Sequence, residues 1–243
     1  MKLNEHEAIL TSRLLLVPYS THHVPTYHEW MQDEEIQKAT ASDPLSLPEE
    51  HAMQQSWRLD HDKLTFIICS APPPSTNASP TTLIPQEHDT PSTMLGDVNL
   101  FLYEDPDLPS STTTPSTDPT DSVPIIGELE IMLPLPSSRR QGLATSALKA
   151  FVAYITSPTN LPRIMEEYRL GCDERSERFL RYLRVKIDKE NEASLGLFGK
   201  LGFARVGEVN YFGEVEMRRE VREGGMTDGL AEGEVGTVVG YVK

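Results

Sequence analysis

The residues with the clearest chemical potential lie near the middle of the chain, in the stretch "RRQGLA" (residues 139–144), which precedes an apolar segment of helical periodicity. The first turn of a helix leaves backbone N–H groups unpaired and carries about half a positive charge, so it attracts anions. Gly142 and Ala144 are small enough for phosphates to approach the backbone, while Arg139 and Arg140 add positive charge. The stretch therefore predicts a diphosphate cradle. The simpler alternative is that it only caps a surface helix.

Composition and missing motifs exclude several classes of protein. The sequence has neither GxxxxGK[ST] nor GxGxxG, which argues against an NTPase or a dinucleotide-dependent dehydrogenase. A formal net charge of -15 argues against nucleic-acid binding. Cys69 and Cys172 lack the neighbours of a zinc site, so we expect no metal. No signal peptide or membrane-spanning segment is apparent, so we expect no membrane partner and a cytoplasmic protein with access to the nucleus.

Apolar runs and turn residues predict the elements around this stretch. Strands are expected at residues 12–20, 63–70, 94–103, 125–133 and 180–188, with a last strand or hairpin at 206–221. Helices are expected at residues 22–40, 46–57, 143–155 and 191–203. The region after Pro158 is charged and is expected to be irregular.

Segments rich in Pro, Ser and Thr set the expected domain boundaries. Residues 71–93 and 104–124 contain few large apolar side chains, so burial would not offset the entropy of ordering them. We expect two mobile loop insertions within a single domain of residues 1–221. Residues 222–243 form an acidic, Gly-rich tail, of which "VGTVVGYV" could dock as an edge strand.

Two carboxylates in the strand before the cradle are candidate bases. Glu128 and Glu130 alternate with Leu129 and Ile131, so the glutamates share one face of the strand. Either could accept a proton directly or through water. The alternative is that they form salt bridges on a solvated sheet face. In the neighbouring strand "GDVN" contains Asp97 and Asn99, which could orient an acceptor or cap a β-bulge.

The chain resembles the GCN5-related N-acetyltransferase superfamily. Arg139-x-x-Gly142-x-Ala144 resembles its coenzyme A loop, and the segment from Asn191 to Phe203 resembles its later helix and turn. Residues 17–31, 40–57 and 96–102 resemble the N-acetyltransferase 9 branch of this superfamily. The resemblance covers residues 3–221, interrupted by the two insertions.

This resemblance implies an α/β (α+β) fold with a mixed sheet of about six or seven strands flanked by four helices. Acetyl-CoA would lie in a V-shaped gap between the strands at residues 125–133 and 182–188. The pantetheine would pair with the backbone of Ile131, Met132 and Leu133, and the diphosphate would meet the amides of Arg139, Arg140, Gln141, Gly142, Leu143, Ala144 and Thr145. Asn191 would lie near the pantetheine or the catalytic water, or would be a plain helix N-cap.

The implied activity is acetyl-CoA-dependent transfer of an acetyl group to a protein or peptide amine. An N-terminal α-amine is favoured because its pKa is about 8, whereas that of lysine is about 10.4, so less free energy is needed to deprotonate it. The family often uses a tyrosine as general acid where this chain has Phe198, so Tyr211 or solvent would protonate the thiolate. Tyr27, His28 and Trp30 belong either to an acceptor lid or to the core.

Two other functions remain open at this point. The same fold could be a non-catalytic module that acts through a protein partner such as the cytoskeleton. It could also acetylate a small polyamine or an antibiotic.

Overall fold

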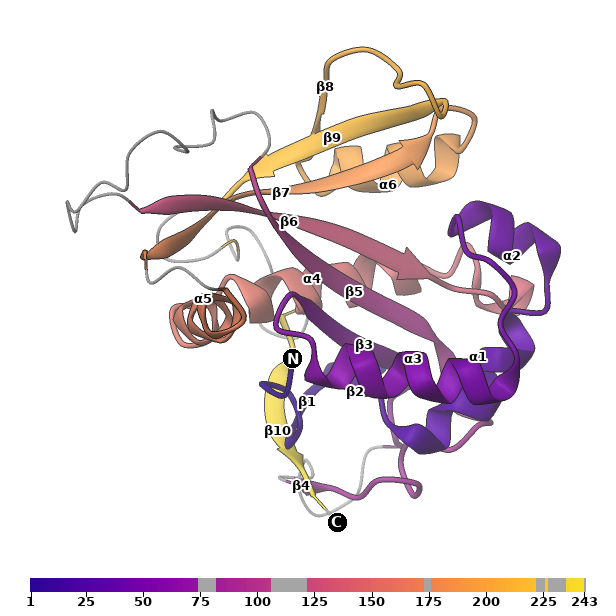
Figure 1. Cartoon of the computed structure of the whole chain (residues 1–243). Coiled ribbons are helices and arrows are strands. Elements are labelled where there is room, and N and C mark those ends of the chain that lie inside the picture. The colour runs from indigo at the N-terminus through magenta and orange to yellow at the C-terminus, as the bar shows by residue number, and fades with distance from the viewer. Residues whose placement is uncertain (74–81, 106–121, 173–175, 222–225, 227–234, 243) are drawn as a thin grey trace.

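The computed structural model describes residues 1–73, 82–105, 122–172, 176–221, 226 and 235–242. Within these residues ten strands form one mixed sheet, in the order β4-β10-β1-β2-β3-β5-β6-β7-β9-β8 (Figure 1). The strands are β1 (Glu7–Leu10), β2 (Leu14–Pro18), β3 (Lys63–Ser70), β4 (Thr82–Leu83), β5 (Met94–Glu104), β6 (Val123–Met132), β7 (Arg178–Asp188), β8 (Ala204–Val206), β9 (Glu214–Glu220) and β10 (Thr237–Tyr241). The α/β prediction is confirmed, although the sheet has more strands than the expected six or seven.

Helices cover both faces of this sheet. The described part of the chain has six α-helices, namely α1 (Val24–Trp30), α2 (Glu34–Ala39), α3 (Leu47–Leu59), α4 (Leu143–Ile155), α5 (Asn160–Leu170) and α6 (Glu192–Lys200). One apolar core joins α4, α5 and α6 to one face of the sheet, and a second joins α1 and its neighbours to the other. The central strands of the sheet therefore lie between two layers of helices (Figure 1). No helix among the described residues is long and apolar enough to cross a membrane.

The helix expected at residues 22–40 is divided in two. A 3-10 turn (Thr21–His23) leads into α1, which ends at Trp30, and α2 begins at Glu34. Asp33 separates them because its backbone is extended and its side chain accepts a hydrogen bond from the Glu35 amide at 2.8 Å, which caps α2. The expectation of one continuous helix is therefore wrong.

Residues 160–170 form a helix, so the expectation of an irregular region after Pro158 is wrong up to Leu170, whereas residues 171–172 and 176–177 belong to no helix or strand. Within α5, Ile164, Met165 and Tyr168 are buried and share one face at helical spacing. Packing of this face against the core stabilises a helix whose other face is charged. The helices at 46–57, 143–155 and 191–203 are confirmed within a few residues. The hairpin expected at 206–221 is also found, but its first strand begins earlier, since β8 spans Ala204–Val206 and pairs with β9.

Part of the first expected insertion is ordered. Residues 82–93 contain β4 and a turn, and Asp89 is fully buried. The Asp89 Oδ2 atom lies 2.9 Å from Nε2 of both His22 and His23, and it accepts a hydrogen bond from the Tyr241 hydroxyl. The prediction of a mobile loop is wrong for these residues because this polar cluster fixes them. Residues 74–81 and 106–121 of the two insertions lie outside the described residues.

The C-terminal segment is part of the sheet. β10 pairs antiparallel with β1 and parallel with β4, so it lies one strand inside the edge. The prediction that this segment docks as a strand is confirmed, but the prediction that it forms the edge strand is wrong. Residues 237–241 therefore do not belong to a tail, whereas residues 222–225 and 227–234 lie outside the description.

Candidate active site at the divergence of two parallel strands

The adjacent parallel strands β6 and β7 separate halfway along their length. Their pairing runs from Val123 with Arg178 to Glu128 with Arg184 and then stops. Residues 129–132 of β6 stay paired with β5, and residues 185–188 of β7 stay paired with β9. Each strand therefore follows its outer neighbour, and the β7-facing edge of β6 is left without a strand partner beyond Glu128 (Figure 1).

This edge contains the three residues expected to bind pantetheine. Ile131 and Met132 end β6, opposite Val98 and Asp97 of β5, and Leu133 follows them. β5 approaches this end closely, since a Cβ atom on Gly96 would lie 1.9 Å from the Met132 carbonyl oxygen. The structure places the backbone of these residues along the divergence, so their contact with pantetheine stays a prediction that the geometry allows.

The expected diphosphate loop lies immediately after this edge. Gly142 is the N-cap of α4, with φ of 75° in the left-handed region and no side chain to cap the helix. The first intrahelical bond runs from the Ser146 amide to the Gly142 carbonyl at 3.0 Å. Within the described residues, the amides of Leu143, Ala144 and Thr145 donate to no acceptor. These are the N–H groups that an anion at a helix N-terminus would accept from.

Room for an anion exists beside these amides. A Cβ atom added to Gly142 would have only the Arg13 guanidinium within 4 Å, at 3.8 Å. Arg13 Nη1 donates to the Gln141 carbonyl at 2.9 Å, and Arg139 Nη2 donates to the Pro134 carbonyl at 3.2 Å. Arg140 is exposed and has φ of 61°. Hydrogen bonds to main-chain carbonyls thus hold the loop, and its cationic groups lie around it. This arrangement fits a diphosphate.

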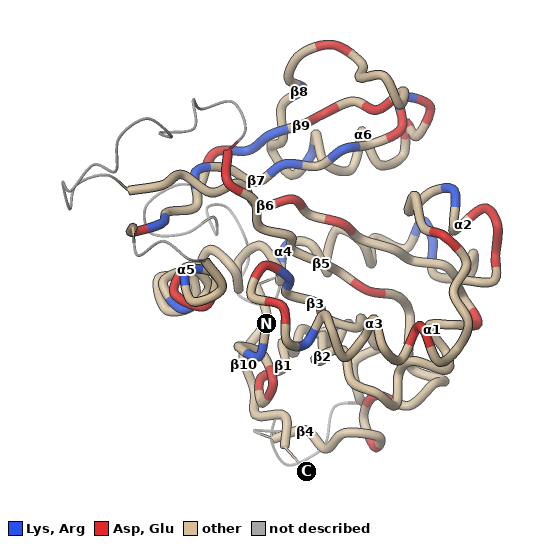
Figure 2. Tube along the Cα trace, viewed as in Figure 1, with Lys and Arg blue, Asp and Glu red and all other residues tan. Residues whose placement is uncertain are grey.

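The two candidate bases occupy different environments. Glu128 Oε2 lies 2.6 Å from Arg184 Nε and 3.4 Å from Lys186 Nζ, so it forms the salt bridges that were its alternative interpretation. Glu130 makes no ion pair or side-chain hydrogen bond among the described residues, and the residue is only partly covered by its neighbours at the divergence. Figure 2 shows acidic positions in the middle of β5 and β6, with basic positions on β7 and β9.

Glu130 has the electrostatics of a base that works near neutral pH. Desolvation by the surrounding protein, together with the like charges of Glu128 and Asp97, raises the pKa of Glu130 to about 7, although Lys186 opposes this shift. Such a carboxylate is ionised in part at pH 7 and still holds a proton well. The structure separates the two glutamates in this way, and the catalytic role of either stays a prediction.

The other proposed site residues come from the C-terminal half. Asn191 is the N-cap of α6, and its Oδ1 accepts a hydrogen bond from the Ser194 amide at 3.1 Å. The cap is observed, and the cofactor role stays a prediction. Tyr211 is 97% exposed in the turn before β9, where its ring meets Phe212 edge-on. Its role as general acid is likewise untested.

Aromatic residues considered for the acceptor side are partly structural. Phe198 is buried and packs edge-on against Phe203 at 5.2 Å between ring centroids, so the position where the family often has an acid is part of the core. Tyr27 and Trp30 are buried in the core on the α1 side, whereas His28 is half-buried. The core interpretation is therefore confirmed for Tyr27 and Trp30.

Sequence reasoning missed several residues near the site. Arg13 lies over the diphosphate loop although it is 128 positions away in the chain. Tyr19 and Glu50 lie on the same side of the sheet as Asp97 and are almost fully buried. No local sequence signal marks Glu50, because its burial depends on how α3 packs against the sheet.

Comparisons with known proteins agree with this geometry. The family model described as "Acetyltransferase (GNAT) domain" matches residues 13–204. An N-acetyltransferase 9-like protein of Schizosaccharomyces pombe is 36% identical over 89% of this chain and 97% of its own length. Alpha/beta-tubulin-N-acetyltransferase 9 of Drosophila melanogaster is 38% identical over 91% of this chain and 90% of its own length. The human protein of that name is 36% identical, covering 92% and 87%.

Solved structures share the fold at much lower identity. The ribosomal L7/L12 alpha-N-protein acetyltransferase RimL, in complex with coenzyme A, superposes with a TM-score of 0.55 at 14% identity, covering 88% of this chain and 97% of that one. Spermidine N-acetyltransferase of Vibrio cholerae, with CoA and spermine, gives a TM-score of 0.56 at 14% identity, covering 89% and 99%.

Proposed function

Because the chain belongs to the GNAT family of acetyltransferases and takes its acetyl group from acetyl-CoA, we propose that its acceptor is the N-terminal α-amine of a protein or peptide. The observation that carries the proposal is the divergence of β6 and β7. Around it lie the unpaired backbone edge of β6, the free amides of α4 and the side chain of Glu130, whose pKa is raised. The extended pantetheine arm of the donor can pair with such an edge.

The donor would be held mainly by backbone groups. The amides of residues 142–145 and the backbone of residues 131–133 provide directional contacts, and Arg13, Arg139 and Arg140 add positive charge near the diphosphate. Acetyl-CoA supplies an acetyl group that is activated as a thioester. Backbone contacts suit such a ligand because they are fixed by the fold before it binds.

Glu130 would accept the proton that the neutral α-amine releases as it attacks the thioester, directly or through one water. An α-ammonium has a pKa of about 8, so part of the acceptor is free amine near neutral pH, and a carboxylate with a pKa of about 7 is then ionised in part. A lysine side chain, with a pKa of about 10.4, would need several kcal/mol more to reach its free-base form at pH 7. Tyr211 is a candidate proton donor to the leaving thiolate, with solvent as the alternative.

Further observations support the proposed acceptor and compartment. The Drosophila and human relatives are named for N-acetylation of α/β-tubulin, which supports a cytoskeletal protein as acceptor or partner. Cys69 and Cys172 are free, as is usual for proteins in a reducing compartment. We place the protein in the cytoplasm, with access to the nucleus.

The test combines binding with turnover on one preparation. Isothermal titration with acetyl-CoA should show saturable binding, and thiol release should then follow when peptides with varied N-termini are added. Peptides with a free N-terminus should react, and the same peptides with an acetylated N-terminus should not, even when they contain lysine. Turnover on lysine alone would overturn the α-amine assignment. Binding without turnover on any acceptor would instead favour a module that acts through its partner.

A further inference from the structure

Five buried polar atoms on the α1–α3 side of the sheet have no hydrogen-bond partner among the described residues. We call the residues that carry them the polar cluster: Tyr19 (OH), Glu50 (Oε2), Thr65 (Oγ1), Asp97 (Oδ1) and Asn99 (Oδ1). Each of these residues is less than 9% exposed. A buried polar atom without a partner costs on the order of 1–3 kcal/mol, so five together require an explanation beyond folding.

Strand register places most of the cluster in one row. Thr65 of β3 lies opposite Asn99 of β5, and Asn99 lies opposite Glu130 of β6. Tyr19 follows the last paired residue of β2 and continues this row beside Thr65. Residues opposite each other in antiparallel strands point to the same face. The row therefore runs from below α1 and α3 to the candidate base.

The remaining two residues complete the cluster from either side. Asp97 lies two positions from Asn99 on the same face of β5, and its Oδ2 accepts a hydrogen bond from Asn99 Nδ2 at 2.7 Å. Trp57 of α3 meets Phe101 of β5 edge-on at 5.8 Å, so α3 lies over this face. Glu50 is two helical turns before Trp57 and shares its side of α3.

Electrostatic contacts bring Glu50 and Asp97 to the same place. In addition to burial, the charges of both carboxyl groups raise the pKa of the Tyr19 hydroxyl, and they also raise the pKa of the Tyr27 hydroxyl. The charge of Asp97 also raises the pKa of Glu130. The two acids therefore lie around the same tyrosine hydroxyls, and Asp97 lies within reach of the candidate base.

The unpartnered atoms define the chemistry of a ligand. Three are carboxyl or carboxamide oxygens, and the other two are hydroxyls that can also accept. The Asn99 amide is already used as a donor to Asp97, which leaves its oxygen as the free atom. All five atoms can accept a hydrogen bond, so the set is rich in acceptors, and its two acids are negative when ionised. Burial raises the pKa of Asp97 to about 7, and a bound cation would favour the ionised form.

We propose that the polar cluster binds the positively charged, hydrogen-bond-donating group of the acceptor, with Asp97 as its anchor, and presents the acceptor to Glu130. The group is an ammonium or a guanidinium, supplied either by the acceptor's own α-amine or by a cationic side chain close to it. This inference rests on the proposed function for the identity of the acceptor, but cation binding by the cluster does not depend on turnover.

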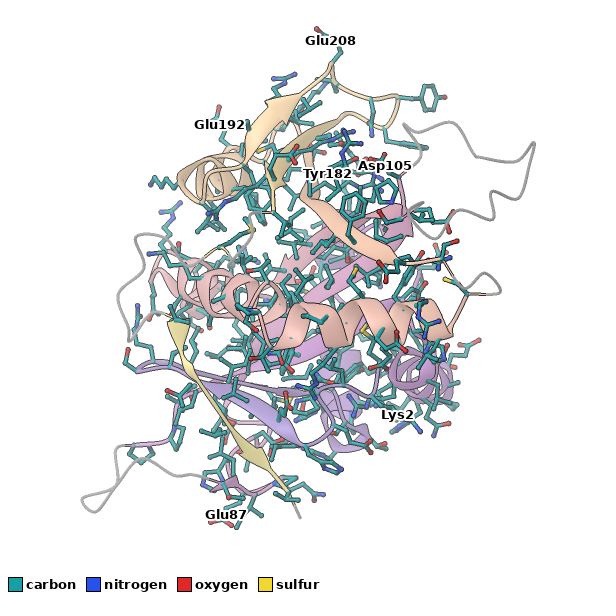
Figure 3. All side chains as sticks on the ribbon, turned by 90° about the vertical axis from the view of Figure 1, so that its left-hand side faces the viewer. Lys2, Glu87, Asp105, Tyr182, Glu192 and Glu208 are labelled. Carbon is teal, nitrogen blue, oxygen red and sulfur yellow. The ribbon has the colours of Figure 1, made fainter. Side chains whose placement is uncertain are left out.

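The first experiment measures cation binding alone. The folded protein is titrated with n-propylammonium and with methylguanidinium, followed by NMR chemical shifts, with 1-propanol as the uncharged probe. At least one cation should bind saturably, and Asp97→Asn or Glu50→Gln should weaken it about tenfold. Glu87→Gln is the matched control because Glu87 is exposed at the outer surface (Figure 3). No saturable binding, or equal binding in all variants, would mean that only water solvates the cluster and would overturn the proposal.

The second experiment connects the cluster to the acceptor. Asp97→Asn should raise the KM for a peptide about tenfold while the KM for acetyl-CoA stays unchanged. If this effect persists with a peptide that has no cationic side chain, the α-amine is the bound group; if it disappears, the side chain is. Turnover with an unchanged peptide KM in both Asp97→Asn and Glu50→Gln would overturn the proposal and leave the proposed function intact. Cation binding without any turnover would contradict the proposed function and leave the cluster as a cation site.

Discussion

Glu130 is the residue whose environment most directly predicts a measurable property. Its pKa of about 7 means that the carboxylate is ionised above neutral pH, and an α-amine with a pKa of about 8 must also lose a proton. Below pH 7 the logarithm of kcat/KM should therefore rise with a slope near two. In Glu130→Gln only the amine titrates, so the slope should fall towards one and the rate should drop by roughly 100-fold. A pH–rate profile from thiol release measures both.

Glu128→Gln is the matched control for this profile. It removes the partner of Arg184 and Lys186 without removing the candidate base, so the slope should remain near two. A slope that falls in Glu128→Gln and not in Glu130→Gln would exchange the roles of the two glutamates. Calorimetric binding of acetyl-CoA should be unchanged in Glu130→Gln, since that carboxylate is not expected to contact the diphosphate.

The sequence could nominate these residues but could not separate them. Alternation along a strand puts Glu128 and Glu130 on one face, and it makes both of them equally good candidates for the base. What distinguishes them is Arg184, which is 56 positions away on a parallel strand that pairs with β6 only as far as Glu128. The Asn191 cap was predictable because its effect is local: an Asn directly before a helix. Arg13 and Glu50 were missed because only tertiary packing brings them to the site.

Among the elements, α4 with its preceding loop makes the clearest prediction. Gly142→Glu would place a bulky anion beside the free amides of α4, so acetyl-CoA should bind at least 100-fold more weakly by isothermal titration. Because φ at this position is 75°, any side chain also introduces strain of about 1–2 kcal/mol. The fold should survive, since a Cβ there meets only Arg13, and circular dichroism checks this.

Gly142→Asn separates charge from backbone strain. Asn tolerates the left-handed region better than other residues and has no charge, so it should weaken binding far less than Gly142→Glu. Equal affinity in wild type and Gly142→Glu would show that the loop only caps the helix. A large loss in both variants would assign the effect to strain or bulk rather than to repulsion.

Elements with local signals were predictable, and those defined by distant contacts were not. α3 has a capping box at Ser46 and Glu49, and α4 has a clear apolar face. By contrast, α5 looked irregular because its charged residues hid three buried apolar ones, and β4 becomes a strand only by pairing with β10. Pairing between segments so far apart in the chain has no local signature.

At the scale of the whole molecule, the divergence follows from how the sheet is assembled. β5 pairs with β6 from Ile125 to Met132, while β9 pairs with β7 and α6 packs against the same core as β7. The two halves of the sheet are joined only by the first part of the β6–β7 pair. The unpaired edge of β6 is thus a property of the sheet topology. Sequence reasoning could predict this topology only through the family resemblance.

On the β10 side of the sheet one buried carboxylate joins three segments of the chain, and this gives a prediction for global stability. Asp89 Oδ2 contacts His22, His23 and Tyr241, and so joins α1's leading turn and the 82–93 segment to β10. Burial alone would raise the pKa of Asp89, but these hydrogen bonds outweigh it and hold the pKa below its ordinary value. Tyr241→Phe removes one donor and keeps the ring, so the free energy of unfolding in urea should fall by about 1–2 kcal/mol.

The control and the pH dependence follow from the same contacts. Thr237→Val changes an exposed residue of the same strand and should leave the unfolding free energy within about 0.5 kcal/mol. A carboxyl whose folded pKa is depressed stabilises the protein above its unfolded pKa and loses that contribution as pH falls. The difference between wild type and Tyr241→Phe should therefore be full at pH 7 and shrink on strong acidification. An unchanged unfolding free energy in Tyr241→Phe at pH 7 would show that β10 is held by its strand pairing alone.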